Sequence, residues 1–210
     1  MGSYYYLGAQ LPYLIYGRNP PMSSAAFKVL ATEQMSSSDA ALLEYCCLDP
    51  DPLSDPQTEN QKPAPPEKKL SYANPVRKTS SPLINRWKEW ERLLRLNLAK
   101  ARAQKLKREI KESERVEIPE TPSEILTAVR NSMTIESPLE AELFLDKTRF
   151  NAIDGFLGID IFSENAMCAY LLKLLLMERR AAFVTEDGYE EYERLYAAIL
   201  GQQETSGEAK

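Results

Sequence analysis

The segment Glu164–Arg180, which reads ENAMCAYLLKLLLMERR, decides the fold class of this chain. Ser163 precedes it as a helix N-cap, and Lys173 is the only charged residue between Glu164 and Glu178. Apolar side chains at nearly every position would cover all sides of a helix, and such a helix is stable only when other elements surround it. The segment therefore predicts the central helix of an all-α protein.

The chain before this segment supplies helical partners for it. Residues 137–140, SPLE, combine capping-box spacing with proline at the first helical position, and the helix of residues 139–153, LEAELFLDKTRFNAI, follows. Gly155 and Gly158 are expected to end that helix. A shorter helix is expected over residues 121–129. Strand alternation is suggested only in residues 4–7, so the pattern predicts about six helices.

A long amphipathic helix is predicted from Leu83 to Arg115. Its apolar side chains recur every three or four residues, as Trp87, Trp90, Leu94 and Leu98. From Asn85 to Arg115 there are eleven Lys/Arg and five Asp/Glu, a net charge of +6, whereas the rest of the chain carries −11. The basic helix is interpreted as a core element or a protein-binding surface, rather than a nucleic-acid site, because both Trp residues lie on the apolar stripe.

The remaining parts of the chain divide by composition. Residues 1–48 hold an aromatic strip, with five of the eleven tyrosines in the first 27 residues, and two short helices expected at 24–35 and 38–48. Residues 49–82 hold eight of the fourteen prolines and are interpreted as a linker. Residues 83–200 form the main helical portion, with a last helix at 187–200, and residues 201–210 are expected to be a disordered tail. Together these parts make one composite domain.

The composition disfavours several classes of site. The chain contains no histidine, so the commonest general base and most zinc sites are missing. Cys46, Cys47 and Cys168 have neither metal-ligand nor disulfide spacing, which favours a reducing cytoplasm. No apolar run approaches the roughly 20 residues of a transmembrane helix.

Two groups of residues could still carry chemistry. Glu142 and Asp146 lie one helical turn apart and could act as an acid–base pair or hold a metal. Lys173 could be a desolvated catalytic amine. The favoured interpretation is structural: the carboxylates lie on a solvated face or one paired with Arg149, and Lys173 pairs with a neighbouring carboxylate or reaches solvent.

Several blocks of the sequence resemble a known family. Residues 1–27 and residues 169–173, AYLLK, resemble a poorly characterised bacterial family that accompanies V-type rotary ATPases. That family is distantly similar to the C/d subunit of V- and A-type ATPases. Residues 139–150, LEAELFLDKTRF, and residues 91–106, ERLLRLNLAKARAQKL, resemble segments of the same proteins. The present chain is much shorter than a C/d subunit, and residues 49–82 have no counterpart there.

The resemblance implies a non-catalytic component or assembly partner of a bacterial V-type ATPase. A C/d subunit couples the rotating central stalk to the proteolipid ring, so the implied partners are subunits of the stalk or the ring. The implied location is the cytoplasm, at the inner membrane face through those partners, without a membrane-spanning segment, a cofactor, a metal or nucleic acid. The alternatives are a helical adaptor unrelated to the ATPase and a carboxylate-dependent enzyme.

The residues expected to meet a protein partner are tyrosines of the strip and basic residues of the long helix. They are Tyr4, Tyr5, Tyr6, Arg95, Arg102, Lys105 and Arg108. Tyrosine combines a large apolar body with a polar tip, and arginine and lysine would meet an acidic partner surface.

Overall fold

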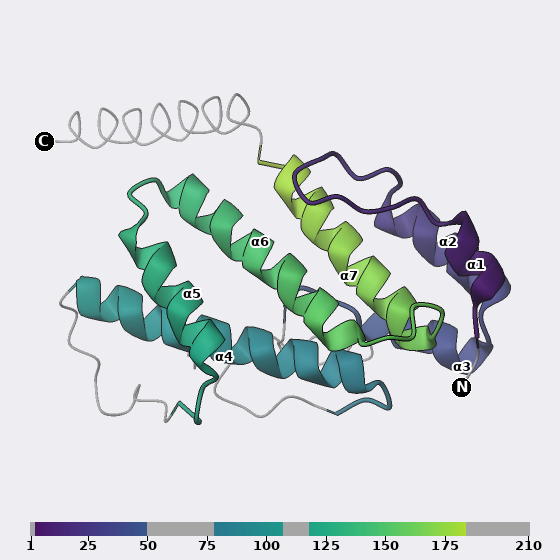
Figure 1. The fold of residues 1–210 in the computed structure, drawn as a ribbon, viewed down its shortest axis with the longest axis horizontal. Helices are drawn as coiled ribbons and strands as arrows, with labels where there is room; N and C mark the ends of the chain where they lie inside the picture. The colour runs from purple at the N-terminus through teal and green to yellow at the C-terminus, as the bar shows by residue number, and fades with distance from the viewer. Residues whose placement is uncertain (1–2, 50–77, 107–117, 184–210) are drawn as a thin grey trace, which may run out of the picture.

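The computed structural model describes residues 3–49, 78–106 and 118–183. Within these ranges the chain forms seven α-helices and one short 3-10 helix, and it contains no strand, which confirms the all-α fold (Figure 1). The elements are α1 (Tyr5–Gln10), α2 (Ser24–Gln34), α3 (Ser37–Ala40), η1 (Ala41–Tyr45), α4 (Pro82–Lys105), α5 (Ser123–Thr134), α6 (Pro138–Leu157) and α7 (Glu164–Ala181).

Helix α7 is the centre of the fold, as the sequence predicts. Ser163 caps it by accepting a hydrogen bond from the backbone N–H of Ala166. The helix contacts α6, α2, α4 and η1, and Figure 1 shows it between α6 and α2. Leu171, Leu172 and Leu174 are fully buried. Neighbours on several sides therefore cover the apolar surface that no isolated helix could shield from water.

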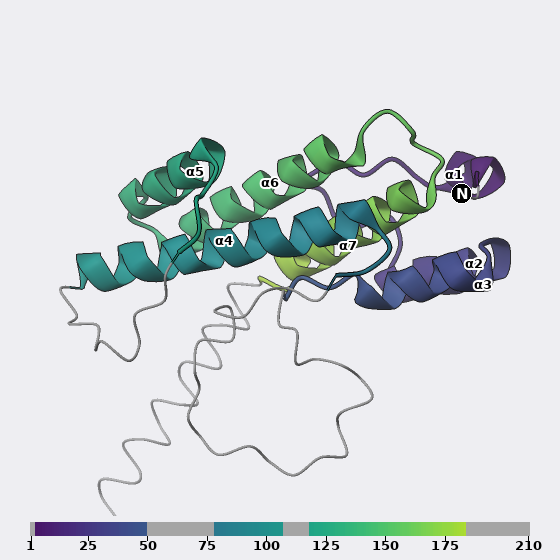
Figure 2. The same cartoon turned by 90° about the horizontal axis from the view of Figure 1, so that it is seen from below.

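Helix α4 lies across α5, α6 and α7 and contacts all three (Figure 2). Trp87, Trp90 and Leu94 are buried, which confirms the predicted apolar stripe. The helix begins at Pro82, where Ser81 caps it, and ends at Lys105, short of the predicted Arg115. Residues 107–115 lie outside the described ranges.

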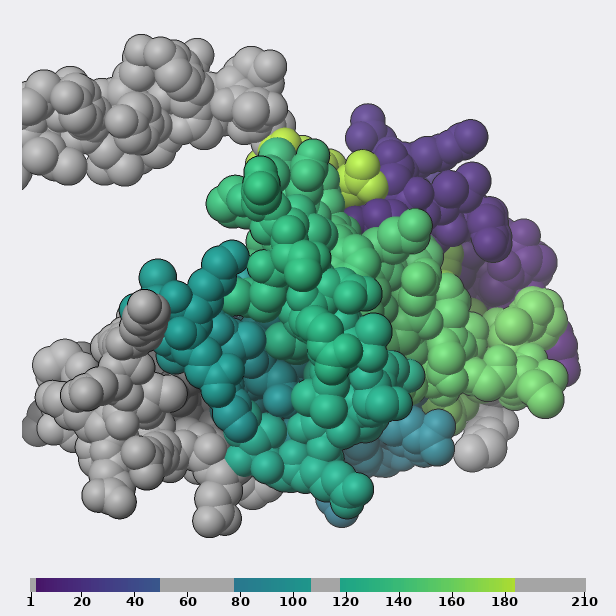
Figure 3. All heavy atoms as spheres, turned by 60° about the vertical axis from the view of Figure 1, so that its left-hand side comes forward, coloured from purple at the N-terminus to yellow at the C-terminus, as the bar shows by residue number. Residues whose placement is uncertain are grey.

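The start of the aromatic strip, Tyr5–Gln10, is the short helix α1 rather than the strand suggested for residues 4–7. Leu7 is buried, and the backbone N–H of Tyr4 donates to the carbonyl of Phe162 at 2.7 Å. Figure 3 shows the purple N-terminal segment beside the light green end of α6 and its loop. The Gly8 N–H donates to the Tyr4 carbonyl at 2.9 Å, so this segment is bonded within itself as a helix is, rather than to a neighbouring strand.

One other predicted helix end is wrong, and another is confirmed only in part. The predicted helix over 38–48 is instead α3 followed by η1, and it stops at Tyr45 because Cys46 is extended. This extension lets the Cys47 carbonyl accept from Trp87 Nε1 at 2.9 Å. Gly155 lies inside α6, and Gly158, at φ 74°, ends the helix. The predicted helix over 24–35 agrees closely with α2.

Most of the predicted linker lies outside the described ranges, as do the predicted helix 187–200 and the tail 201–210. Among the described residues, no helix is both long enough and apolar enough to cross a membrane.

Gly8 allows α1 to approach the loop after α6. A Cβ atom at this position would lie 2.8 Å from Cδ1 of Phe162, whereas a Cβ at Gly155 would meet nothing within 4 Å. We expect Gly8→Ala to lower the free energy of unfolding by about 1 kcal/mol, because the ring of Phe162 must move. We expect the matched control Gly155→Ala to raise it by roughly 0.5–1 kcal/mol through helix propensity. Urea unfolding checks both values, and equal shifts of the same sign would contradict the tight approach.

Candidate functional site

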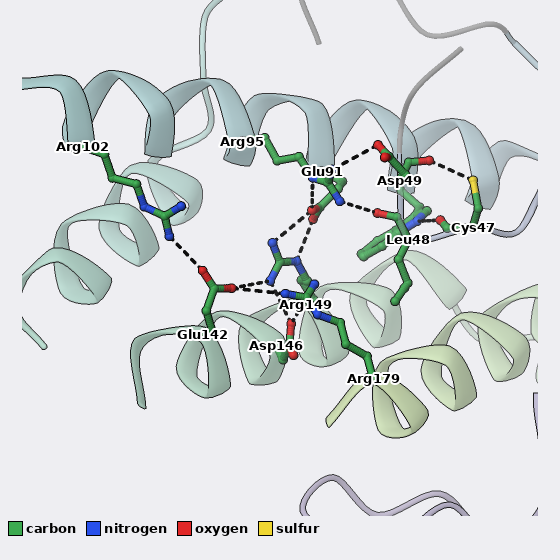
Figure 4. A network of polar contacts seen from close by, with 11 residues as sticks. Cys47, Leu48, Asp49, Glu91, Arg95, Arg102, Glu142, Asp146, Arg149 and Arg179 are labelled. Carbon is green, nitrogen blue, oxygen red and sulfur yellow. Dashed lines mark hydrogen bonds and ion pairs between the residues drawn. The ribbon is translucent and has the colours of Figure 1, made fainter. Parts of the chain in front are cut away.

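A buried ion-pair network joins α4, α6 and α7 and contains the carboxylates singled out by the sequence (Figure 4). At its centre, the guanidinium of Arg149 on α6 donates to both carboxylate oxygens of Glu91 on α4, at 2.9 and 3.0 Å. Glu91 is fully buried, and Arg149 is nearly so. A bidentate pair of this kind fixes the spacing and the relative rotation of the two helices.

Asp146 is the most enclosed carboxylate of the network. Its Oδ1 accepts from Arg149 Nη1 at 2.8 Å, and Arg179 of α7 lies 3.6 Å away. Its Oδ2 is buried with no hydrogen-bond partner. Burial raises the pKa of the Asp146 carboxyl, and the guanidinium groups of Arg149 and Arg179 oppose that rise.

Glu142 lies one turn before Asp146, at the edge of the network. Its two oxygens accept from different helices, Oε1 from Arg102 of α4 at 2.8 Å and Oε2 from Arg179 of α7 at 3.3 Å. Glu142 and Asp146 therefore share the cations of one network, which confirms the interpretation of this face as salt-bridged with Arg149.

Arg95 extends the network to the segment that follows η1. Its Nε donates to Glu91 at 2.7 Å, and its terminal nitrogens contact the Asp49 carboxylate at 3.0 Å and the Leu48 carbonyl at 2.8 Å. Arg95 thus bridges the buried centre of the network to the last described residues before position 50.

The network is better suited to holding helices together than to moving protons. A general base needs an oxygen within reach of a substrate, whereas these carboxylates are directed at guanidinium groups inside the fold. A buried pair contributes little net stability, but it rejects packings that would leave one charge unpaired. The network therefore specifies how α4, α6 and α7 meet.

The sequence analysis missed the role of Glu91, although a signal was present. Glu91 occurs at the same three- and four-residue spacing as Trp87 and Leu94, so it lies on the apolar stripe of α4. Asp146 and Arg149 likewise precede Ile153 at three- and four-residue spacing, so they lie on the core-facing stripe of α6. Charges of opposite sign on the core-facing stripes of two helices predict a buried pair.

Lys173 is also engaged within the fold. Its ammonium group donates to Asp154 of α6 and lies 4.7 Å from the ring centroid of Phe150. The sequence interpretation of Lys173 as the partner of a carboxylate on a neighbouring helix is confirmed.

The tyrosines proposed for partner binding differ in their surroundings. The Tyr4 hydroxyl donates to Asp39, and burial together with this hydrogen bond raises the pKa of Tyr4. The Tyr5 ring contacts the Phe162 ring in a tilted arrangement, with centroids 4.7 Å apart, yet Tyr5 remains exposed. Tyr6 exposes 74% of its surface. Tyr4 is thus an anchor, whereas Tyr5 and Tyr6 are accessible to a partner.

The basic residues proposed for partner binding lie away from the tyrosines. Arg95 and Arg102 belong to the ion-pair network, and Lys105 donates to the Met133 carbonyl at 3.3 Å. Arg108 lies outside the described ranges. Figure 1 shows the C-terminal end of α4 and helix α1 at opposite ends of the molecule, so the structure does not bring the two predicted groups together.

A shallow groove of about 310 Å³ lies between α4, α5 and α6. Trp90 and Phe156 line it, and Glu124 at its edge accepts from Trp90 Nε1 at 3.3 Å. No group of three or more Cys, Asp or Glu residues in the described part of the chain is arranged to hold a metal ion.

No family model, curated protein or solved structure matches this chain. The resemblance to the ATPase-associated family therefore stays a prediction that rests on the quoted sequence blocks.

Proposed function

We propose that this protein is a non-catalytic helical component or assembly partner of a bacterial V-type ATPase, placed as the C/d subunit is between the central stalk and the proteolipid ring. The proposal rests on the resemblance of residues 1–27, 91–106, 139–150 and 169–173 to the ATPase-associated family and the C/d subunit. It places the protein in the cytoplasm, held at the membrane face through its partners, and assigns it no cofactor.

The non-catalytic part of the proposal rests on one observation, namely that the candidate catalytic groups are ion-paired within the fold. Glu142 and Asp146 are paired with arginines of the fold, and Lys173 is paired with Asp154. This pairing favours an adaptor over a carboxylate-dependent enzyme. A carboxylate catalyst needs a group of perturbed pKa that faces a cleft, whereas Asp146 faces the helix interfaces.

The network also suits a mechanical role. An adaptor between a rotating stalk and a ring must pass force from one interface to another without changing its own shape. The bidentate pair between Glu91 and Arg149 cross-links α4 and α6, and Arg179 adds α7 to the same network. Directional bonds of this kind resist sliding between helices better than apolar packing alone, because they lose energy steeply when their geometry changes.

The proposal predicts that the basic end of α4 contributes to binding the ATPase. We expect Lys100→Glu combined with Lys105→Glu to reduce co-purification of ATPase subunits several-fold at low salt and to make the remaining association less sensitive to salt. The measurement is recovery of subunits with tagged protein from its own cells at low and high salt. Both lysines are exposed, so the fold should persist.

The matched control reverses two exposed lysines elsewhere, Lys78→Glu combined with Lys147→Glu, and should leave recovery unchanged. Arg102 is kept in both variants because it pairs with Glu142. Recovery of no ATPase subunit with the unaltered protein at either salt concentration would contradict the proposed function. An equal loss in both double variants would assign the effect to net charge rather than to the end of α4.

A further inference from the structure

One end of the molecule carries large apolar side chains that face outward. They come from α1 and from the loop of residues 158–163 between α6 and α7, and they are Tyr5, Tyr6, Ile159 and Ile161. Ile159 exposes 99% of its surface and Ile161 57%. Single exposed apolar residues are ordinary, but a group contributed by two neighbouring segments marks an interaction surface. We call these four residues the end surface.

The two segments of the end surface are fixed to one another. The Tyr4 backbone N–H donates to the Phe162 carbonyl, and the rings of Tyr5 and Phe162 are in contact. Asp160 holds the loop itself, because its Oδ1 accepts from the Phe162 N–H at 3.0 Å and its carbonyl accepts from the Ser163 hydroxyl at 3.0 Å. A surface that is already ordered loses little conformational entropy when a partner binds.

The end surface contains one carboxylate, that of Asp160, which is exposed between the two isoleucines. Residues 3–10 and 158–163 contain no lysine or arginine. Asp154, in the last turn of α6, is already paired with Lys173. The end surface therefore combines apolar contact area with the negative charge of Asp160.

We infer that the end surface binds an amphipathic helix of a partner protein whose apolar face is flanked by lysine or arginine. An apolar helix face would cover the isoleucines and tyrosines, and a flanking cation would meet Asp160. Apolar side chains alone would also suit a lipid surface. An anionic bilayer would repel Asp160, which stands between the two residues that would enter the bilayer.

A second copy of this chain fits the end surface less well. A two-fold pair through this surface would bring Asp160 of one copy toward Asp160 of the other. The basic end of α4 is at the opposite end of the molecule, so pairing it with the end surface of another copy would build an open chain of copies rather than a closed dimer.

A photo-crosslinking experiment identifies directly the molecule that binds the end surface. Ile159 is replaced by p-benzoylphenylalanine in the full chain, expressed in its own cells, and the adduct is identified by mass spectrometry. The matched control carries the same group at Leu126, which is exposed on α5 and is not part of the end surface. We expect at least tenfold more adduct from position 159, on a helical segment with an apolar face and excess lysine and arginine.

Two substitutions at Asp160 separate charge from loop shape. Asp160→Asn keeps an oxygen that can accept from the Phe162 N–H but removes the charge, and Asp160→Lys reverses the charge. We expect the adduct yield at position 159 to fall about threefold with Asp160→Asn and at least tenfold with Asp160→Lys. Unchanged yields in both variants would overturn the assigned charge of the partner.

The inference is overturned if the adduct at position 159 is a lipid, another copy of this chain or an acidic segment, if position 126 gives equal yield, or if no adduct forms. The crosslinking result can be distinguished from the co-purification result that tests the proposed function. A basic helix on a protein outside the ATPase, together with no co-purified ATPase subunit, supports the inference and contradicts the proposed function. ATPase subunits that co-purify without any adduct at position 159 contradict the inference alone.

Discussion

Leu174→Asp is expected to leave the protein largely unfolded at 25 °C. Leu174 is fully buried in the middle of α7, the helix that α6, α2, α4 and η1 contact. The substitution removes a core side chain, which alone costs about 2–5 kcal/mol, and places an unpaired carboxylate among apolar neighbours, which costs several kcal/mol more. A domain has a total stability of about 5–15 kcal/mol, so this loss is comparable to the whole.

Circular dichroism and urea unfolding measure this effect. The matched control is Ile159→Asp, which introduces the same charge in place of an apolar side chain that is 99% exposed, and it should change stability by less than about 0.5 kcal/mol. A melting temperature for Leu174→Asp within a degree or two of the unaltered protein would mean that α7 is not central.

Arg149→Met is expected to destabilise the protein by about 3–5 kcal/mol, although methionine fills similar volume. The substitution removes the guanidinium shared by the buried carboxylates of Glu91 and Asp146, so that Glu91 keeps only Arg95 and Asp146 keeps only Arg179. Removing one partner from buried charges costs far more than the intact ion pairs contribute to stability. The control Arg102→Met breaks an exposed pair with Glu142 and should cost no more than about 1 kcal/mol.

The loss in Arg149→Met should depend on pH. Burial already raises the pKa of Asp146, and removal of Arg149 takes away one of the charges that oppose this rise. A carboxyl whose folded pKa is raised destabilises the fold at a pH above that pKa, and the penalty disappears as pH falls toward its unfolded pKa. We therefore expect the deficit of Arg149→Met to be largest at neutral pH and to shrink on acidification, as followed by urea unfolding from pH 7 to pH 4.

The double variant Glu91→Leu with Arg149→Met provides a further check. An apolar pair of similar size often replaces a buried ion pair at little cost, so the double variant should recover part of the stability lost in Arg149→Met. Recovery should be incomplete because Asp146 keeps only its contact with Arg179. A double variant less stable than Arg149→Met would contradict the view that Glu91 destabilises the fold once it has lost its bidentate partner.

The sequence by itself predicted the elements whose burial follows from local pattern. Residues 164–180 are apolar on nearly every side, so only a central position could satisfy them, and α7 occupies that position. The three- and four-residue spacing from Trp87 to Leu98 in the same way marked the buried stripe of α4. Pairing of Glu142 and Asp146 with Arg149 was also predictable, because residues three, four and seven apart share one face of a helix.

Other features depended on residues distant in the sequence. Local pattern marked Glu91 as a charge on an apolar stripe, but only the approach of α6 to α4 placed Arg149 opposite it. The 38–48 segment leaves the helix at Cys46, and the Cys47 carbonyl then meets the Trp87 indole forty residues later in the chain.

The end surface likewise arises from tertiary structure. Neither the strip nor the loop 158–163 is unusual alone, and Phe162 joins them through contacts with Tyr4, Tyr5 and Gly8. The sequence by itself thus determined which residues are buried in the core, since hydrophobic periodicity is a local property of the chain. The tertiary structure decided which charges meet and which apolar side chains stay exposed, since both depend on how the helices pack against one another.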